Sequence, residues 1–346
     1  MFSSISSSQT VLRNPINSAM NYAKKKAAVL YHYPCPDGVF AALAAHLYFS
    51  ATSSPVLFFP NTVYNPIKPE QLPLQEIGDV YLLDFVGPSG FVADLSSKVQ
   101  NVIILDHHKT ALETLGGGTS LGENVTKTID MERSGATIAY DFFKQKLSER
   151  NEGSYEAVLA EYERMRKLFE YIEDGDLWKW QLESSKAFSS GFKDQKIEFD
   201  FRKNSSVFQQ LLSLNLEAVI NQGIISIAHK QKLISESLER SFAIRLGGGD
   251  FGCCLAVNVD EALSELRSEL GNQLACKSQD HNLRGIGAIV YTVPELGNDQ
   301  MLKISLRSVR SEDTTPISEK YGGGGHRNAS SFLLTSAEFE AWKIVS

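Results

Sequence analysis

The chain has 346 residues, of which 42% are hydrophobic and 22% are charged. This length and apolar content are enough for two folded domains, so we expect a globular protein. Lys and Arg number 34 against 41 Asp and Glu, giving a net charge of −7. That balance argues against a broadly basic surface that holds long nucleic acid, and no apolar stretch approaches the roughly 20 residues that cross a bilayer.

The first 26 residues are rich in serine and contain no Asp or Glu, while Arg13 and Lys24-Lys25-Lys26 are basic. This composition resembles an organellar transit peptide, and it also fits a disordered tail. The four cysteines form no CxxC pair, which predicts reduced thiols, no disulfides and an intracellular compartment. We expect a cytoplasmic protein, with a mitochondrion or plastid left open by the acid-free N-terminus.

Alternating strands and helices are predicted for the first half of the chain. Apolar runs bounded by turn residues predict strands over residues 27–33, 56–59, 79–85 and 101–105. Helices are expected after Pro34–Gly38, near 91–99, over 137–147 with Ser134 as N-cap, and over 155–173. This alternation predicts a mostly parallel sheet with helices on both faces, in a domain over residues 27–183.

The second half predicts a helical connector and a smaller domain. Apolar residues recur at helical spacing over 205–242 and are interrupted at Gly223, which indicates two amphipathic helices in a connector over residues 184–245. Strands over 252–257, 286–293 and 301–308, with a helix near 261–276, predict a smaller α/β domain over 246–346. The fold class is therefore α/β with two domains and a helical connector.

Carboxylates and imidazoles stand where the predicted strands and helices end. Asp84 closes an apolar run, and Asp106-His107-His108 directly follows the buried strand over 101–105. Further clusters lie at His32 to Asp37 and at Asp174-Gly175-Asp176. Ligands of open α/β sheets lie at the carboxyl ends of parallel strands, and mixed Asp and His sets suit Mn²⁺, Mg²⁺ or Zn²⁺. A two-metal centre is predicted, although each cluster alone also fits a turn or a helix cap.

The motifs, in this order, resemble the DHH phosphoesterase superfamily, which is named after the tripeptide at Asp106-His107-His108. The matching segments are His32-Tyr33-Pro34-Cys35-Pro36-Asp37-Gly38, Asp84 after its strand, the DHH tripeptide, and Asp174 in Glu173-Asp174-Gly175-Asp176-Leu177-Trp178. In the second domain, Ser305-Leu306-Arg307-Ser308 and the run from Gly322 to Ser330 resemble the DHH-associated substrate-binding domain.

The resemblance implies two divalent ions, Mn²⁺ in the first place and Mg²⁺, Zn²⁺ or Fe²⁺ as alternatives. One ion would be held by Asp37, Asp84, His107 and Asp174, and the other by His32 and a bridging Asp84. Family members usually carry an Asp at the position of Cys35. A Cys35 thiolate would favour a softer metal, although the side chain could also merely pack.

The expected catalytic residues are Asp84, Asp106 and His108, and His108 would orient or protonate groups near the leaving oxygen. Phosphate binding is expected from glycine backbone N–H groups together with charged side chains. The residues concerned are Arg307, Gly323, Gly324, Gly325, His326 and Arg327.

The resemblance implies hydrolysis of short nucleotide phosphoesters: very short oligonucleotides, as in an oligoribonuclease or exonuclease, linear dinucleotides, or 3′-phosphorylated nucleotides. Two alternatives remain open, namely a pyrophosphatase or short polyphosphatase, and a nucleotide-binding regulatory module without turnover. The expected partners are short nucleotides rather than long nucleic acid or a membrane, and a homodimer is left open.

Overall fold

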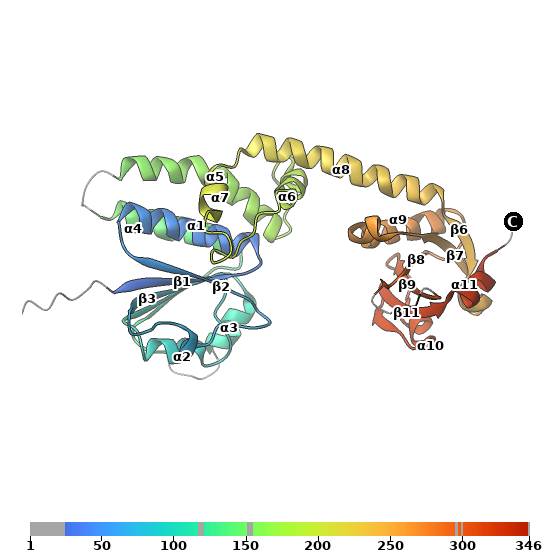
Figure 1. Cartoon of the computed structure of the whole chain (residues 1–346), viewed down its shortest axis with the longest axis horizontal. Helices are drawn as coiled ribbons and strands as arrows, with labels where there is room; N and C mark the ends of the chain where they lie inside the picture. Colours follow the sequence, from blue (N-terminus) through green and yellow to red (C-terminus); the bar gives the residue numbers. More distant parts are fainter. Residues whose placement is uncertain (1–24, 117–120, 151–154, 295–296, 299, 345–346) are drawn as a thin grey trace, which may run out of the picture. The chain divides into compact units, whose positions relative to one another are not determined.

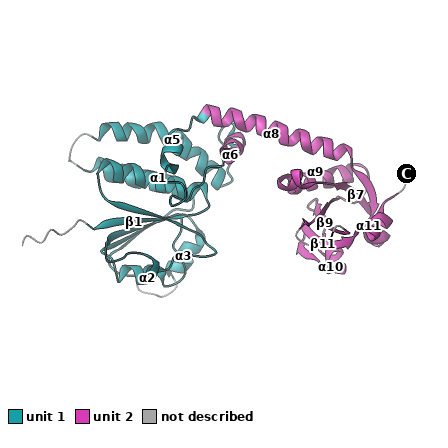
Figure 2. Ribbon diagram, viewed as in Figure 1, with its two compact units in different colours: residues 1–185, 196–216 teal, residues 186–195, 217–346 magenta. Residues whose placement is uncertain are grey.

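A computed structural model describes residues 25–116, 121–150, 155–294, 297–298 and 300–344. The described residues form two compact units (Figure 2). The first unit contains the residues up to 185 together with 196–216, and the second contains 186–195 together with 217 onward. The segment 184–245, expected as one connector, is thus shared between the units. The basic N-terminal run that suggests a transit peptide lies almost wholly outside the described residues.

The first unit is built on a five-stranded sheet in which every pairing is parallel, as the sequence predicts. The order across the sheet is β2-β1-β3-β4-β5. The strands are β1 Lys26–His32, β2 Val56–Asn61, β3 Ile77–Leu83, β4 Asn101–Asp106 and β5 Val125–Ile129. The sequence prediction missed β5, because its residues Val-Thr-Lys-Thr-Ile lack the apolar run that marks a strand buried on both faces.

Helices cover both faces of this sheet (Figure 1). One face carries α2 Phe91–Ser96 and α3 Lys109–Gly116, and the other carries α1 Pro36–Ala51, α4 Gly135–Ser148 and α5 Glu156–Asp176. Leu30, Leu82 and Ile104 belong to the core beneath α2 and α3, and the intervening strand residues are buried on the opposite face. Burial on both faces explains the uninterrupted apolar runs of β1, β3 and β4.

The strand order reverses at β1. The chain passes from β1 through α1 to β2 on one side, and then returns to β3 on the other side of β1. The connections that leave the carboxyl ends of β1 and β3 therefore diverge and leave a crevice between them. In open α/β sheets this switch point is where ligands bind.

The second unit contains a six-stranded mixed sheet in the order β10-β11-β9-β8-β7-β6. Among its described strands only β7 and β8 pair in parallel, and they are joined through η3 Glu261–Leu266 and α9 Arg267–Asp280. The strands are β6 Phe242–Arg245, β7 Cys253–Asn258, β8 Ile286–Thr292, β9 Met301–Ser308, β10 Gly324–His326 and β11 Ala329–Thr335. The unit also contains the short helices η2 Leu246–Gly249, α10 Thr315–Lys320 and α11 Ser336–Trp342.

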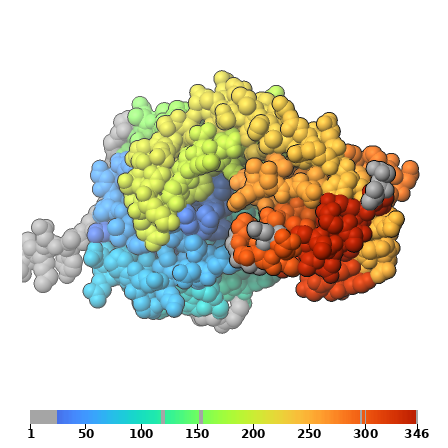
Figure 3. Space-filling model, turned by 45° about the vertical axis from the view of Figure 1, so that its right-hand side comes forward, coloured from blue at the N-terminus to red at the C-terminus, as the bar shows by residue number. Residues whose placement is uncertain are grey.

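The expected helix break at Gly223 is wrong. After α7 Val207–Leu212, helix α8 runs without interruption from Leu216 to Glu239 and lies beside α9 (Figure 3). A Cβ at Gly223 would lie only 1.7 Å from the Ala187 carbonyl oxygen of α6 Ser185–Asp194. Gly223 therefore permits close contact between two helices. Among the described residues, no helix is both long and apolar enough to span a membrane.

Candidate metal centre

Acidic and imidazole side chains from several elements meet at the switch point of the first unit. β1 ends at His32, and Asp37 lies in the first turn of α1. Asp84 directly follows β3, and His107 directly follows β4. Asp176 is the last residue of α5. Because parallel strands end at one edge of the sheet, residues far apart in the sequence converge there.

The His107 ring lies at the centre of this group. Its Nε2 atom is 3.2 Å from Asp84 Oδ1, 3.5 Å from Asp176 Oδ2 and 3.8 Å from Asp37 Oδ2. The other oxygen of Asp84 lies 3.1 Å from His32 Nδ1. The carboxylates of Asp37 and Asp84 are buried, so water does not compensate their charge.

Three polar atoms at this point have no hydrogen-bond partner although they are buried: Asp37 Oδ2, Asp84 Oδ1 and His107 Nε2. An unpaired buried polar group costs about 1–3 kcal/mol, and more if it is charged. Native structures keep such atoms where a ligand or ion pairs them. Two carboxylate oxygens and one imidazole nitrogen are a ligand set for a divalent cation, so these residues fit a metal ion.

The potential ligand atoms fall into three overlapping groups. The groups are Asp37, His107 and Asp176; His32, Cys35 and Asp84; and Asp84, Asp106, His107 and His108. Within each group the potential ligand atoms all lie within 4.8 Å of one another. Asp84 and His107 each occur in two groups. The described residues therefore offer overlapping ligand sets that could hold a metal ion.

Electrostatics at the site favour a bound cation. Burial raises the pKa of Asp37, and the nearby carboxylates of Asp84 and Asp176 raise it further. The pKa of Asp176 is raised by burial and by Asp84. Burial also opposes ionisation of Asp84, but the nearby His107 and His32 rings outweigh it and lower the pKa of Asp84 to about 2. A divalent ion would remove the repulsion among the three carboxylates.

Asp106 holds the DHH turn in place and orients His108. Its Oδ1 atom accepts the His107 backbone N–H at 2.7 Å and lies 2.8 Å from His108 Nδ1. The hydrogen bond with Asp106 raises the pKa of His108 to about 9. The His108 ring therefore carries a proton at neutral pH, and with 43% of its side chain exposed it is open to a substrate.

The N-terminus of helix α4 contacts Asp37. The Ala136 backbone N–H donates to Asp37 Oδ1 at 3.0 Å. Between Ala136 and the N-cap Ser134 lies Gly135, where a Cβ would come within 2.8 Å of both Asp37 Oδ2 and Asp84 Cβ. Gly135 is thus required by the close approach of the α4 N-terminus to two carboxylates, a role that the sequence analysis missed.

Asp174, which the sequence prediction names as a metal ligand, is buried and bonds to the loop after α5. Its Oδ1 and Oδ2 atoms accept the backbone N–H groups of Gln181 at 2.9 Å and Leu182 at 3.3 Å. Asp174 therefore holds the loop after α5, and Asp176 occupies the cluster instead. The apolar stripe Tyr162, Met165, Phe169, Ile172 continues at helical spacing to Asp176, and this periodicity was the available signal.

Substitutions at these two aspartates should separate their roles. Asp176→Asn removes a charged ligand, so we expect Mn²⁺ affinity to fall by about tenfold or more while the free energy of unfolding changes little. Asp174→Asn disturbs only loop hydrogen bonds, and should cost about 1–2 kcal/mol of stability with near-normal metal affinity. Calorimetric titration measures the Mn²⁺ affinity of each variant, and urea unfolding measures its stability. Equal losses of Mn²⁺ affinity in the two variants would refute the separate roles of Asp174 and Asp176.

The predicted phosphate-binding residues come together in part. Arg307 on β9 lies opposite Ala329 of β11, which in turn lies opposite His326 of β10, so Arg307 and His326 share one face of the second sheet. Arg307 Nε donates to Ser268 Oγ at 3.3 Å. Arg327 is directed elsewhere, because its Nε donates to the Glu312 carbonyl at 3.3 Å.

The three glycines before His326 differ in whether the local backbone would accept a side chain. A Cβ at Gly323 would lie 2.1 Å from the Ser331 carbonyl oxygen, and Gly325 has a φ of 146°. These two glycines are therefore required by the backbone. Gly324 is exposed and has nothing within 4 Å of a Cβ, and its backbone lies opposite Ser331 of β11.

Arg267 was missed by the sequence analysis. Its guanidinium carbon lies 3.7 Å from the centre of the Tyr291 ring, and its buried Nε atom has no hydrogen-bond partner. Tyr291 lies opposite Lys303 of β9. Lys303 and Arg307 are four residues apart on that strand, so Tyr291 lies on the same face of the sheet as Arg307. No sequence pattern pointed to this stacked pair.

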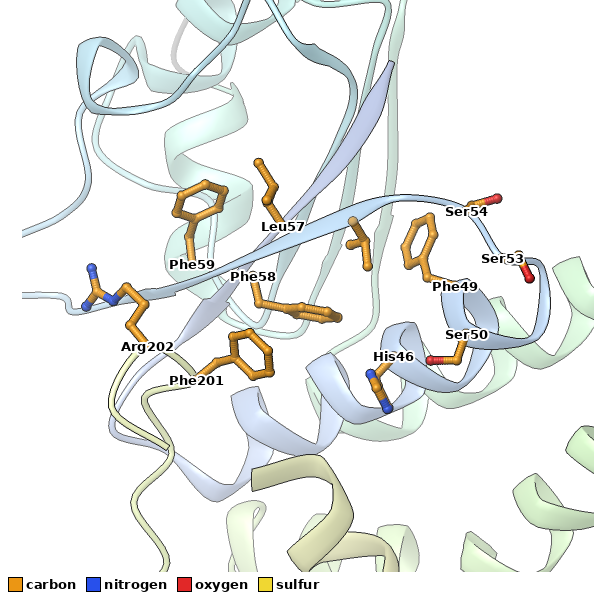
Figure 4. Close-up of a pocket in the computed structure, with 11 residues that line it drawn as sticks. His46, Phe49, Ser50, Ser53, Ser54, Leu57, Phe58, Phe59, Phe201 and Arg202 are labelled. Atoms are coloured by element: carbon orange, nitrogen blue, oxygen red, sulfur yellow. The ribbon is translucent and has the colours of Figure 1, made fainter. Parts of the chain in front are cut away.

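A separate hollow of about 700 Å³ at the outer edge of β2 lacks comparable chemistry (Figure 4). Four phenylalanines and three serines contribute to its lining, and His46 stacks on Phe208 at 4.5 Å with its pKa lowered by burial. The one arginine in the lining, Arg202, is paired with Asp200 at 2.8 Å. His46 is therefore a packed histidine.

Comparison with known proteins finds two similar sequences. An uncharacterized protein of Acanthamoeba polyphaga mimivirus is 25% identical over 93% of this chain and 70% of its own length. The cyclic-di-AMP phosphodiesterase PdeA of Listeria monocytogenes is 26% identical over 82% of this chain. The match spans only 38% of the length of that phosphodiesterase.

Among solved structures, the pGpG-specific phosphodiesterase PggH of Vibrio cholerae matches with a TM-score of 0.40 and 10% identity, covering 92% of this chain and 95% of its own. A TM-score this low supports no conclusion on function. No protein-family profile matches the chain. The comparisons thus establish a distant similarity to a phosphodiesterase sequence, and they do not by themselves assign the chain to a family.

Proposed function

We propose that the chain is a divalent-metal-dependent phosphoesterase that hydrolyses short nucleotide phosphoesters. The observation that carries this proposal is the set of three unpartnered buried atoms, Asp37 Oδ2, Asp84 Oδ1 and His107 Nε2, at the switch point of a parallel sheet. The DHH-type motifs and the similarity to a cyclic-di-AMP phosphodiesterase support the same reaction class.

The proposed ligands of one ion are Asp37, His107 and Asp176, and those of the other are His32 and Cys35, with Asp84 shared between the two. Bound divalent ions supply activation of water and neutralisation of phosphoryl charge. Burial and the neighbouring Asp84 and Asp37 carboxylates raise the pKa of Cys35, so its thiol stays protonated unless a cation is present. A thiolate ligand would favour Zn²⁺ or Fe²⁺ over Mn²⁺ at that position.

His108 is the proposed proton donor to the leaving oxygen. It is half-exposed, lies beside the cluster and holds its proton at neutral pH through the hydrogen bond with Asp106. An imidazolium in this position matches the requirements of general acid catalysis. Asp106 acts through His108 and is a positioning residue.

The second unit is proposed to bind a phosphate of the substrate through Arg307, His326 and the exposed strand β10 at Gly324. A planar guanidinium and backbone N–H groups are effective partners for phosphate oxygens. Gly323 and Gly325 would shape this loop, since both are required by the local backbone. Arg327 is held to the Glu312 carbonyl and has a supporting role.

Loss of Arg307 should therefore weaken substrate binding rather than the chemical step. For Arg307→Ala we expect KM for a dinucleotide to rise about tenfold, with kcat reduced less, since a charged hydrogen bond contributes about 1.5–3 kcal/mol. Arg310→Ala removes the same charge from an exposed position and should leave KM unchanged. A similar KM for both variants would refute the assignment.

The proposed function is tested with a panel of substrates and ions. Purified protein is stripped with EDTA and assayed with dinucleotides, a 3′,5′-bisphosphonucleotide and pyrophosphate in the presence of Mn²⁺, Mg²⁺, Zn²⁺ or Fe²⁺. We expect mononucleotide or phosphate release from nucleotide esters only after an ion is restored. Faster release from pyrophosphate would favour the pyrophosphatase alternative, and tight nucleotide binding without turnover would favour a regulatory module.

A further inference from the structure

A pocket of about 480 Å³ opens beside the metal-ligand cluster in the first unit. Four of its lining residues belong to the cluster: His32, Asp84, Asp106 and His108. The remaining lining comes from residues 61–66, from the loop at 85–88 and from α3. Its volume lies within the range of about 300–1,000 Å³ that is usual for small-molecule sites. A phosphate at the cluster would therefore have an adjoining space for the group esterified to it.

The side chains of this pocket outside the cluster are uncharged. They are the apolar Val63, Pro66, Phe85, Val86 and Pro88, and the polar Asn61, Thr110 and Thr114. Lysine and arginine do not occur among the described lining residues, whereas Asp84 and Asp106 do. A chain of further phosphates in this space would bring uncompensated negative charge close to two carboxylates.

Outside the cluster, the side chains in the pocket that can form hydrogen bonds are few. Thr110 and Thr114 lie four residues apart on α3 and so occupy the same side of that helix. Asn61 is buried and is held in place because its Oδ1 accepts the Ile67 backbone N–H at 2.8 Å. Apolar walls with a few fixed polar groups are typical of sites for an organic ring system.

We infer that this pocket receives an uncharged, nucleoside-sized group that is esterified to the phosphate at the metal cluster. The site thereby selects nucleotide esters over pyrophosphate and polyphosphate. This inference rests on the proposed function in one respect, namely that phosphate lies at the cluster. It adds the place where the esterified group binds and the residues that select for it, among them Thr114, which lines the pocket from α3.

Equilibrium binding tests the inference without relying on turnover. In the presence of Mn²⁺, calorimetry compares adenosine 5′-monophosphate with inorganic phosphate for the wild type, Thr114→Phe and the control Glu113→Phe. Phe at position 114 fills the pocket, whereas Glu113 is exposed on the same helix and does not line it. We expect the wild type to bind the nucleotide at least about tenfold more tightly than phosphate, and Thr114→Phe to remove that difference alone.

A second variant is expected to gain affinity for a ligand, which a misfolded protein would not do. Thr114→Lys supplies the cation that the pocket lacks, so affinity for pyrophosphate should rise several-fold while nucleotide affinity falls. Three results would each overturn the inference. The wild type could bind nucleotide and phosphate equally tightly, Thr114→Phe could lose affinity for nucleotide and phosphate equally, or neither variant at position 114 could change any of these affinities. If nucleotide binding depends on Thr114 but no phosphoester is hydrolysed with any of the ions, the proposed function fails and the pocket assignment stands.

Discussion

Asp37→Asn should make the metal-free protein more stable while removing most of its activity. In the unfolded state at neutral pH the Asp37 carboxyl ionises freely, whereas in the folded state burial and the neighbouring Asp84 and Asp176 carboxylates oppose its ionisation and raise its pKa. An amide removes this charge and can still accept the Ala136 N–H through its oxygen. We expect the free energy of unfolding without metal to rise by about 1–3 kcal/mol at pH 7. Activity should fall by about 10²–10³-fold, because the loss of a charged ligand costs several kcal/mol of transition-state stabilisation.

The pH dependence of this stability gain has a definite sign. Folding raises the pKa of Asp37, so the wild type binds a proton there more readily when folded and gains relative stability as the pH falls through that raised pKa. The difference between wild type and Asp37→Asn should therefore be largest near neutral pH and shrink in acid. Urea unfolding in EDTA at several pH values measures it.

The matched control is Asp94→Asn, which removes a carboxylate of the same unit that is partly exposed and paired with Lys98 at 2.6 Å. Such a surface change is expected to alter stability by less than about 0.5 kcal/mol. A metal-free Asp37→Asn protein that is less stable than the wild type at pH 7 would contradict the account of a charge-crowded site.

Gly135→Ala should damage the metal site through one added methyl group. The new Cβ would lie 2.8 Å from Asp37 Oδ2 and 2.8 Å from Asp84 Cβ, so at least one of the two carboxylates must move. Overpacking of this kind costs about 1–3 kcal/mol, and a shift of about 1 Å in a catalytic group can cost 10²-fold in rate. We expect both effects, measured by urea unfolding and by initial rates with saturating Mn²⁺.

Gly116→Ala serves as the control for this variant. Gly116 ends α3, a Cβ added there would have nothing within 4 Å, and its φ is not positive. Alanine should therefore be tolerated at this position, with stability unchanged or slightly improved. Normal metal affinity and rate in Gly135→Ala would show that the α4 N-terminus does not position the two carboxylates.

The parallel sheet and the convergence of Asp37, Asp84 and His107 could be predicted from the sequence, because buried strands with polar residues at their carboxyl ends leave a strong pattern. The choice between Asp174 and Asp176 depended on which residue of an Asp-Gly-Asp stretch reaches the ligand cluster, and burial does not decide it, because Asp174 is buried and Asp176 is 24% exposed. Motif matching selected the first, whereas the apolar stripe of α5 points to the second.

Other features leave little trace in a single sequence. β5 is partly exposed and polar, and Gly223 is a helix-contact residue that has the same appearance as a helix breaker. The roles of Gly135 and of the Arg267–Tyr291 pair depend on long-range contacts. The neutral pocket beside the cluster likewise combines residues 61–66, 85–88 and α3, which no local pattern connects.

The most direct test of the central claim is the number of divalent ions bound per chain. Metal-stripped wild type and Asp84→Asn are titrated with Mn²⁺ by calorimetry, and bound metal is counted by elemental analysis after gel filtration. Since Asp84 is the proposed shared ligand, we expect two ions in the wild type and loss of tight binding of both in the variant. Equal Mn²⁺ binding by the two proteins, or none by the wild type with any divalent ion, would contradict the account.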